Sequence, residues 1–261
     1  MPYAGVNGTR LYYEIGGEGD MVVLLHGYLA DADSMEAPAT GLSTGLRAIR
    51  IDRRGHGRSN PVEAPPPLAV EAADVAALLD WFSVDKAHFL THDTGSEVAI
   101  EFALTYPERT RSMCLLSPVA DGFNWSPEET ARQADLRSAL KTDVKKALES
   151  WKASPLFEMS TERDGLVDRV QSLFSRVSGG ITAFERAPVT PTQGQRLASV
   201  TTKTGVFIGE RDEPERIRCA QAIAGRIPGA ELTVFPGLGR FLHVEDARAV
   251  MRRLTDFFIQ D

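Results

Sequence analysis

The residues best suited to chemistry form the stretch Thr-His-Asp-Thr-Gly at residues 91–95. A short apolar run at residues 88–90 precedes it, and a helical pattern of apolar residues follows it. A strand that turns at once into a helix, with small residues around one protruding side chain, is the Gly-x-Ser-x-Gly arrangement that exposes a nucleophile. In this chain Asp93 replaces the serine and Thr91 replaces the first glycine. We therefore expect a carboxylate at the nucleophile position.

A simpler role for Asp93 is also open. Aspartate is a good helix N-cap, so its carboxylate would then only satisfy the first backbone N–H groups of the next helix. Its place between two small residues at the end of a strand favours chemistry, because ligands of parallel sheets bind beyond the carboxyl ends of the strands.

The rest of the chain predicts the elements that position this turn. Asn7-Gly8 between two strand-like segments is a hairpin signal. The continuous apolar run at residues 21–25 is typical of a strand buried on both faces. Further strands, alternating with helices, are predicted at residues 47–51, 88–90, 112–116, 204–208 and 231–235. This alternation predicts right-handed crossovers and a largely parallel sheet.

The alternation stops after Pro118. Ser126-Pro127-Glu128-Glu129 is a capping box with proline at the first helical position, and the pattern from there to about residue 177 predicts only helices. A helical block inserted between strand–helix units predicts a lid over the carboxyl edge of the sheet. We predict a core of residues 1–120 and 200–261, and a helical cap of residues 121–199.

Four motifs in this order resemble the α/β-hydrolase fold superfamily, and the resemblance covers nearly the whole chain. They are His26-Gly27, residues 52–59 with Gly-His-Gly-Arg-Ser, the turn at Asp93, and Gly-Glu-Arg-Asp at residues 209–212. The resemblance implies an α/β fold with a mostly parallel eight-stranded sheet flanked by helices, together with an inserted helical cap.

The resemblance also implies roles for individual residues. In this superfamily the residue after His-Gly and the residue after the nucleophile donate backbone N–H groups to an oxyanion hole, which implies Tyr28 and Thr94. The acid position falls on Asp212, and Asp121 is a second candidate for it. Asp93 resembles the carboxylate of dehalogenases and epoxide hydrolases, which attacks carbon and forms an ester intermediate.

The resemblance fails at the catalytic histidine. Residues 237–245 put Arg240 at the position of the base, and His243 matches a second, usually non-catalytic histidine. Arginine stays protonated in proteins and cannot activate water, whereas histidine titrates near neutrality. We therefore expect Arg240 to pair with the carboxylates of Asp93 and Asp212, and a two-step hydrolase to stall at its covalent stage. A structural salt bridge left by a former triad is the alternative.

The predicted cap gives weaker signals. Epoxide hydrolases of this fold use two cap tyrosines, and residues 121–199 contain none. Haloalkane dehalogenases place a tryptophan directly after the nucleophile, where this chain has Thr94. Trp125, Trp151 and Phe157 are candidates for the substrate pocket, although helical spacing favours the core of the cap for Trp151 and Phe157. We expect the pocket to be mostly apolar with few polar groups.

Three functional hypotheses follow. The first is a non-hydrolytic lyase, cyclase or isomerase, in which Asp93 acts as an acid/base or electrostatic group on a small, partly apolar oxygenated metabolite. The second is a hydrolase that attacks carbon through Asp93 and uses an unrecognised histidine as its base. The third is a ligand-binding or accessory homologue without turnover. Supporting candidates for the site are His26, His92, Asp121 and His243.

Composition excludes several other classes. The 261 residues suffice for one large α/β domain, and a net charge of −7 without a basic cluster argues against a nucleic-acid surface. No run approaches the roughly 18 apolar residues that a membrane span needs, and no His/Cys cluster suits a structural metal. The setting of Cys114 and Cys219 favours buried thiols. We expect a soluble, cytoplasmic protein that acts on a small molecule without a cofactor; a homodimer is compatible with the sequence.

Overall fold

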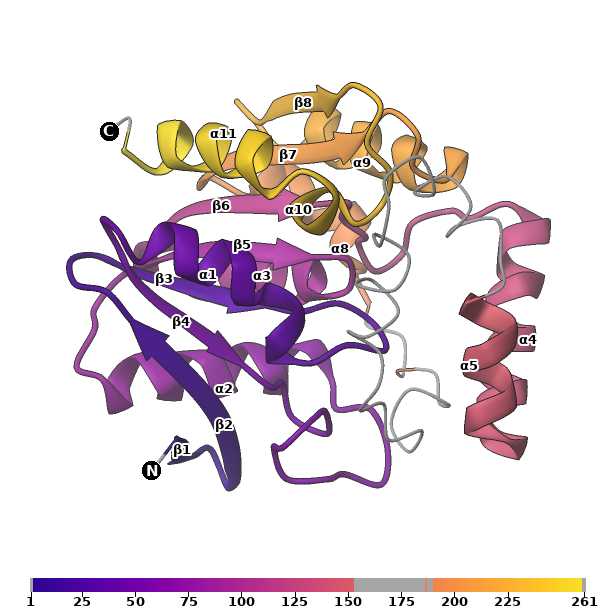
Figure 1. Ribbon diagram of the computed structural model, residues 1–261, viewed down its shortest axis with the longest axis horizontal. Helices are drawn as coiled ribbons and strands as arrows, with labels where there is room; N and C mark the ends of the chain where they lie inside the picture. Colours follow the sequence, from indigo (N-terminus) through magenta and orange to yellow (C-terminus); the bar gives the residue numbers. More distant parts are fainter. Residues whose placement is uncertain (1, 153–185, 187–189, 260–261) are drawn as a thin grey trace.

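Within residues 2–152, 186 and 190–259, which the computed structural model describes, eight strands form one sheet in the order β1-β2-β4-β3-β5-β6-β7-β8. They are β1 (Tyr3–Val6), β2 (Thr9–Gly16), β3 (Met21–Leu25), β4 (Arg47–Ile51), β5 (Ala87–His92), β6 (Thr110–Leu116), β7 (Lys203–Gly209) and β8 (Glu231–Phe235). The pairings of β2 with β1 and β4 are antiparallel, and all others are parallel. The predicted mostly parallel sheet is confirmed (Figure 1).

The first two strands form the hairpin that Asn7-Gly8 predicts. Asn7 has a φ of 45° and Gly8 a φ of 69°, and two positive dihedrals are what a type I′ turn requires. Tyr3 of β1 lies opposite Tyr12 of β2.

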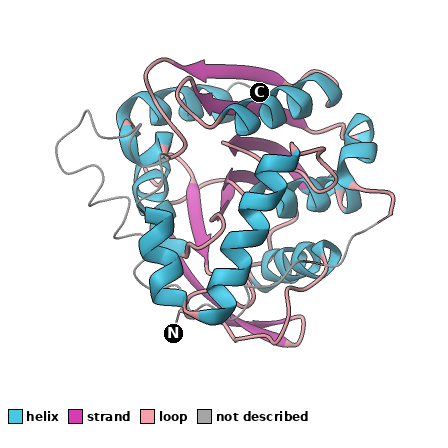
Figure 2. Cartoon of the chain, turned by 90° about the vertical axis from the view of Figure 1, so that its right-hand side faces the viewer, coloured by secondary structure: helices cyan, strands magenta, loops and turns pink. Residues whose placement is uncertain are grey.

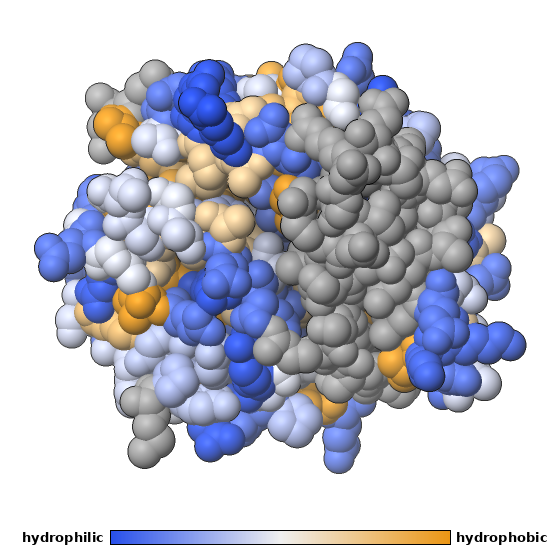
Figure 3. Space-filling model, viewed as in Figure 1, coloured by the Kyte–Doolittle hydropathy of each residue, from blue (hydrophilic) through white to orange (hydrophobic). Residues whose placement is uncertain are grey.

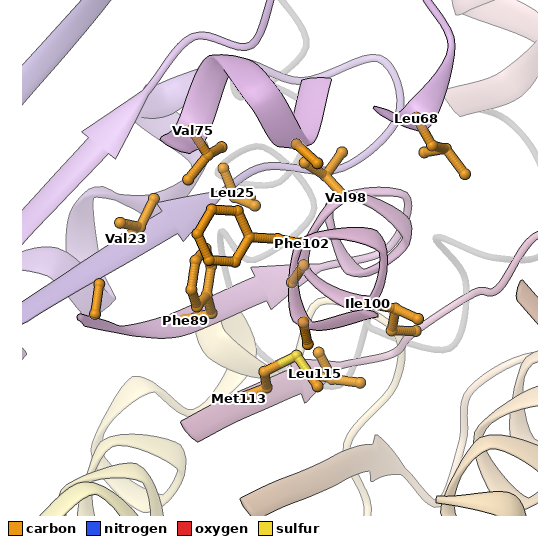
Figure 4. Packing of buried hydrophobic residues seen from close by; sticks show 14 of the residues in the cluster. Val23, Leu25, Leu68, Val75, Phe89, Val98, Ile100, Phe102, Met113 and Leu115 are labelled. Carbon is orange, nitrogen blue, oxygen red and sulfur yellow. The ribbon is translucent and has the colours of Figure 1, made fainter. Parts of the chain in front are cut away.

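Helices cover both faces of the sheet and form two hydrophobic cores with it. One core contains α2 (Leu68–Trp81), α3 (Gly95–Thr105) and α9 (Pro214–Arg226); the other contains α1 (Glu36–Leu42), α10 (Leu242–Glu245) and α11 (Ala247–Ile259). Figure 4 shows the first core, where the ring centroids of Phe89 and Phe102 are 4.8 Å apart. All six residues of β5 are buried, so both cores hold the strand that carries the site. Shorter helices are η1 (Ala32–Met35), η2 (Pro107–Arg109), α8 (Gln193–Arg196) and η3 (Leu197–Ser199).

Helices α4 (Pro127–Thr142) and α5 (Val144–Lys152) stand outside these layers. They lie on the side toward which the parallel strands point, and the view from that side shows them in front of the sheet (Figures 1 and 2). The hydroxyl of Ser126 accepts from the N–H of Glu129 and so caps α4, as its sequence predicts. The extent of the cap over residues 121–199 stays a prediction, because 153–185 and 187–189 lie outside the described residues.

Two further predictions concern the burial of the two cysteines and the absence of long apolar segments. Cys114 and Cys219 are buried free thiols, as expected. Hydrophilic residues cover most of the described surface in Figure 3, and hydrophobic ones form small, separate patches. None of the helices in the described ranges is long and apolar enough to cross a membrane.

Candidate active site

Asp93 lies at a sharp turn between β5 and α3. Its φ is 53°, in the left-handed region that costs a non-glycine residue about 1 kcal/mol, and the residue is 1% exposed. Gly95 begins α3, and a Cβ at this position would collide with the carbonyl oxygens of Leu25 and His26. The positive φ and the close approach of helix to strand match the strand–turn–helix that the sequence predicts.

Cations hold both oxygens of the Asp93 carboxylate. Oδ1 accepts from Nη1 of Arg216 at 2.5 Å, and Oδ2 accepts from Nη2 of Arg240 at 2.8 Å. Arg216 is 8% exposed and Arg240 is 5% exposed, so the three charges are buried together. Charge-assisted hydrogen bonds of this kind are about twice as strong as neutral ones. They occupy lone pairs that a nucleophilic carboxylate would have to use.

The two guanidinium groups also fix the charge of Asp93. Burial alone would raise the pKa of this carboxyl, but Arg216 and Arg240 hold the pKa well below its ordinary value. Burial lowers the pKa of Arg216, yet Asp93 and Glu213 raise it above the ordinary value. Asp93 is therefore an anion at neutral pH and is unsuited to proton transfer, which favours an electrostatic role over the acid/base role.

Tyr28 lies where the resemblance places an oxyanion donor, but its N–H is engaged by Asp93. The donated hydrogen bond, from the Tyr28 N–H to Oδ2 of Asp93, is 3.1 Å long. Gly27 permits this approach, since a Cβ at residue 27 would lie 2.7 Å from Cβ of Asp93. The hydroxyl of Thr94 accepts from Nη2 of Arg53 at 3.1 Å. The Asp93 carboxylate thus accepts the hydrogen bond that Tyr28 was expected to donate to a substrate oxygen.

Asp212 takes no direct part in this arrangement. Its carboxylate accepts from the Ser117 hydroxyl at 2.5 Å and from the N–H of Glu213 at 2.7 Å. Burial raises the pKa of Asp212 to about 6, and the hydrogen bond from Ser117 opposes this shift. Arg240 instead directs Nη1 to Glu213, at 3.3 Å. The expected Asp93–Arg240–Asp212 cluster is corrected accordingly: Glu213 replaces Asp212 because the turn after β7 points the next residue toward the guanidinium.

Arg216 was not predicted as a site residue from the sequence. This residue lies in the first turn of α9, three positions after Glu213, and belongs to no motif. Its guanidinium carbon lies 5.6 Å from the centroid of the Trp125 ring. A cation in the first turn of a helix opposes the helix dipole. The contact with Asp93 offsets that unfavourable placement.

Burial makes the supporting histidines poor bases. Burial lowers the pKa of His92 to about 4, although Asp93 opposes the shift, and Nε2 of His92 lies 3.1 Å from the carbonyl oxygen of Arg240. Burial also holds the pKa of His26 and of His243 well below the ordinary value. His26 accepts from the N–H of Arg53 at 3.1 Å, and the rings of His243 and His92 are 4.6 Å apart. These contacts favour structural roles.

A cavity of about 250 Å³ opens beside the buried ion pairs. Of the described residues that line it, six are arginines: Arg53, Arg132, Arg137, Arg186, Arg216 and Arg240. Three acidic residues, Glu97, Asp121 and Glu129, line it as well. Apolar atoms still make up the larger part of the described lining, but α3, α4 and α9 present more charged side chains to this space than the few polar groups expected.

Some of the site residues predicted from the sequence line this cavity. Tyr28, Thr94, Asp121, Trp125 and Arg240 line it. The side chain of Trp151 and the whole of Phe157 lie outside the described residues. In the part of the chain that the structure describes, no group of three or more His, Cys, Asp or Glu is arranged to hold a metal ion.

Similarity to known proteins extends over most of the chain. A family model described as "Alpha/beta hydrolase family" matches residues 22–253. The dihydrolipoyllysine-residue acetyltransferase component of the acetoin cleaving system of Cupriavidus necator is 30% identical over 253 residues, which cover 94% of this chain and 65% of that protein. This chain thus spans slightly less than two thirds of that relative. The 2-hydroxy-6-oxo-6-phenylhexa-2,4-dienoate hydrolase of Burkholderia cepacia is 27% identical, with 97% of this chain and 92% of the hydrolase covered.

Solved structures show the same fold. A hydrolase from Pseudomonas aeruginosa superimposes with a TM-score of 0.85 at 24% identity, covering 98% of this chain and 97% of the other. The enol-lactonase from Burkholderia xenovorans gives a TM-score of 0.81 at 20% identity, covering 99% of this chain and all of the lactonase. At these identities the likeness concerns the fold alone.

Proposed function

Because the chain belongs to the alpha/beta hydrolase family, we propose that it is an enzyme of this family that acts on a small oxygenated metabolite without a covalent Asp93 intermediate. The reaction class is that of a lyase, cyclase or isomerase. One observation carries the proposal: Arg216, Arg240 and the Tyr28 amide together engage both oxygens of Asp93. Attack on carbon would draw an oxygen away from a buried cation. Breaking a buried ion pair costs about 3–5 kcal/mol.

Arg216 and Arg240 supply the electrostatic part of this function. Both line the cavity, and fixed cations beside a substrate stabilise negative charge that develops on one of its oxygens. Asp93 keeps both guanidinium groups in place. It is a positioning residue in this proposal, and the two arginines are the groups that meet the substrate.

Glu97 is the carboxyl group best suited to proton transfer. It lines the same cavity from the first turn of α3. Burial raises its pKa, although Arg186 and Arg53 oppose the shift, and Nη1 of Arg186 donates to it at 3.1 Å. A carboxyl whose pKa lies closer to neutrality exchanges its proton more effectively. We assign the acid/base role to Glu97 in place of Asp93.

Hydrolysis through Asp93 is the alternative function. Relatives named as hydrolases of 2-hydroxy-6-oxo compounds favour the hydrolytic part of this alternative, and their names say nothing of the nucleophile. The proposal departs from these names because of two residues of this chain, Asp93 at the nucleophile position and Arg240 at the histidine position. Neither residue supplies the hydroxyl nucleophile or the neutral base that two-step ester hydrolysis uses.

The test combines product analysis with the mass of the peptide that contains Asp93. The purified chain is incubated with p-nitrophenyl esters, haloalkanes and epoxides, and the peptide that contains Asp93 is then analysed by mass spectrometry. We expect no ester hydrolysis, no release of halide or diol, and no mass increment on Asp93. An increment on Asp93 together with released halide or diol would establish the hydrolytic alternative and overturn the proposal.

Glu97→Gln provides the positive arm of this test. A compound converted to an isomer or elimination product by the native chain, and left unchanged by a folded Glu97→Gln variant, supports the proposal. Glu101→Gln is the matched control, because Glu101 lies on the same helix, pairs with Arg196 and is not among the described residues that line the cavity. A ligand that binds and is never converted would support the third hypothesis, a binding protein without turnover.

A further inference from the structure

The inner face of α4 is unusually polar. Glu129, Arg132, Gln133, Leu136 and Arg137 all line the cavity, and their three- and four-residue spacing places them on one face of the helix. The face of a helix that is turned toward the protein is normally apolar. Here a single residue of the five, Leu136, is apolar. This face is therefore suited to a polar occupant more than to a core.

The guanidinium groups around the cavity offer more donors than they use. Nε of Arg53, of Arg216 and of Arg240 is buried and has no acceptor within the described part of the chain. A buried donor without a partner costs about 1–3 kcal/mol, and each arginine carries five N–H groups. These three Nε atoms are too deeply buried to meet a ligand, so the cavity relies on the other N–H groups of its arginines. Among the described lining residues six arginines face three acidic residues, an excess of donors that favours a group that only accepts hydrogen bonds.

The cavity also has an apolar portion. Val119, Trp125 and Leu136 line it from the end of β6 and from the predicted cap. A volume of about 250 Å³ leaves space for carbon atoms besides one oxyanion group. Sites for small organic molecules combine such apolar walls with a few polar groups that fix orientation.

We propose that this cavity binds a small organic acid, with its carboxylate on the arginine wall and its hydrocarbon part against Trp125 and Leu136. The inference rests on the proposed function, because it names the class of compound on which that function acts. The carboxylate meets the guanidinium groups on the cavity side. Asp93 accepts from one Nη of Arg216 and one Nη of Arg240, and each guanidinium carries five N–H groups in all.

Isothermal titration calorimetry with three probes separates the parts of this proposal. Phenylacetate carries both the carboxylate and the ring, phenylacetamide carries the ring without charge, and inorganic phosphate carries charge without the ring. We expect phenylacetate to bind at least ten-fold more tightly than either of the other two. Cinnamate and adipate, as carboxylates of other shapes, are titrated alongside it.

Two variants on the same helix locate the site. Arg137→Gln removes a cation from the cavity wall, and Lys141→Gln removes one from an exposed position of α4 one turn further on. We expect carboxylate affinity to fall about ten-fold in Arg137→Gln and to stay unchanged in Lys141→Gln. A loss in both variants would indicate a general charge effect and contradict the assigned place.

Other outcomes overturn the inference directly. Equal affinity for phenylacetate and phenylacetamide would contradict recognition of the carboxylate. Equal affinity for phenylacetate and phosphate would contradict recognition of the hydrocarbon part. If phenylacetate, cinnamate and adipate give no heat of binding at 10-fold molar excess, and ligand-observed NMR also detects no binding, then small organic acids are not the ligands of this cavity. These readouts concern binding only. A mass increment on Asp93 would overturn the proposed function while leaving the carboxylate site standing.

Discussion

Asp93 and Asp212 lie at the ends of two strands of one sheet, and their pKa values are shifted in opposite directions. Two guanidinium groups more than offset the burial of Asp93. Asp212 receives a hydroxyl and an amide hydrogen bond, which do not offset its burial, and its pKa rises to about 6. The partner therefore decides the sign of the shift, since both residues are buried.

Asp212→Asn is expected to stabilise the protein in a pH-dependent way. A carboxyl whose pKa is higher in the folded state contributes stability that is full below the unfolded pKa of about 4 and is lost as pH rises through about 6. Ionised Asp212 therefore costs on the order of 3 kcal/mol at pH 8. Asparagine cannot ionise, so the variant should have the higher melting temperature at pH 8 and the same one at pH 4. Calorimetry over this range checks it; a pH-independent difference contradicts the assignment.

Arg216→Met is expected to destabilise the protein by about 3 kcal/mol, because it leaves a buried carboxylate with one cation fewer. The stability that Asp93 contributes is present above pH 4 and lost as pH falls through its depressed pKa. The variant raises that pKa, so its loss of stability on acidification begins at higher pH. Arg218→Met is the control: Arg218 lies on the same helix and pairs with Glu215 at the surface. Denaturant unfolding should leave the control near the native midpoint, and equal losses would show that burial of Arg216 does not matter.

At the scale of elements, the approach of α3 to β3 sets the position of Asp93. Gly95 allows this approach because a Cβ would meet two backbone carbonyl oxygens, which cannot rotate away. We expect Gly95→Ala to lower the free energy of unfolding by about 2 kcal/mol through overpacking. Gly225 in α9 is the matched control, since a Cβ there meets no atom within 4 Å. Gly225→Ala should stabilise by up to about 1 kcal/mol, and urea unfolding of both variants measures the contrast.

Helix α4 of the predicted cap and helix α3 of the core should also differ in local stability. Of the sixteen residues of α4, Glu129 and Leu140 are buried, whereas eight of the eleven residues of α3 are buried. Local opening is easier where few apolar contacts are lost. We expect amide hydrogens of α4 to exchange at least ten-fold faster than those of α3, as measured by mass spectrometry of peptides. Equal protection would show that α4 unfolds only with the core.

For the whole molecule, the fold was predictable and the site was only partly so. Strand and helix periodicity are local properties, so the sheet and its flanking helices follow from the residues themselves. Asp93 and Arg240 were found because motifs mark their positions. Arg216 and Glu213 were not, because their contact with the site depends on how one turn and one helix are oriented. The charged residues of α4 share one helix face by their spacing, but only the tertiary structure shows that this face lines the cavity.

The hydrogen bond from the Tyr28 amide to Asp93 affects whether a dissolved anion can bind to the same amide. Asp93 is tethered to the place that it fills, so its effective concentration there is set by the fold and is unaffected by dilution. Preorganised intramolecular partners reach effective concentrations far above those of any dissolved metabolite. A free anion therefore competes with Asp93 for the Tyr28 amide at a large disadvantage. Oxyanion chemistry at the Tyr28 amide would therefore require the Asp93 carboxylate to leave it first.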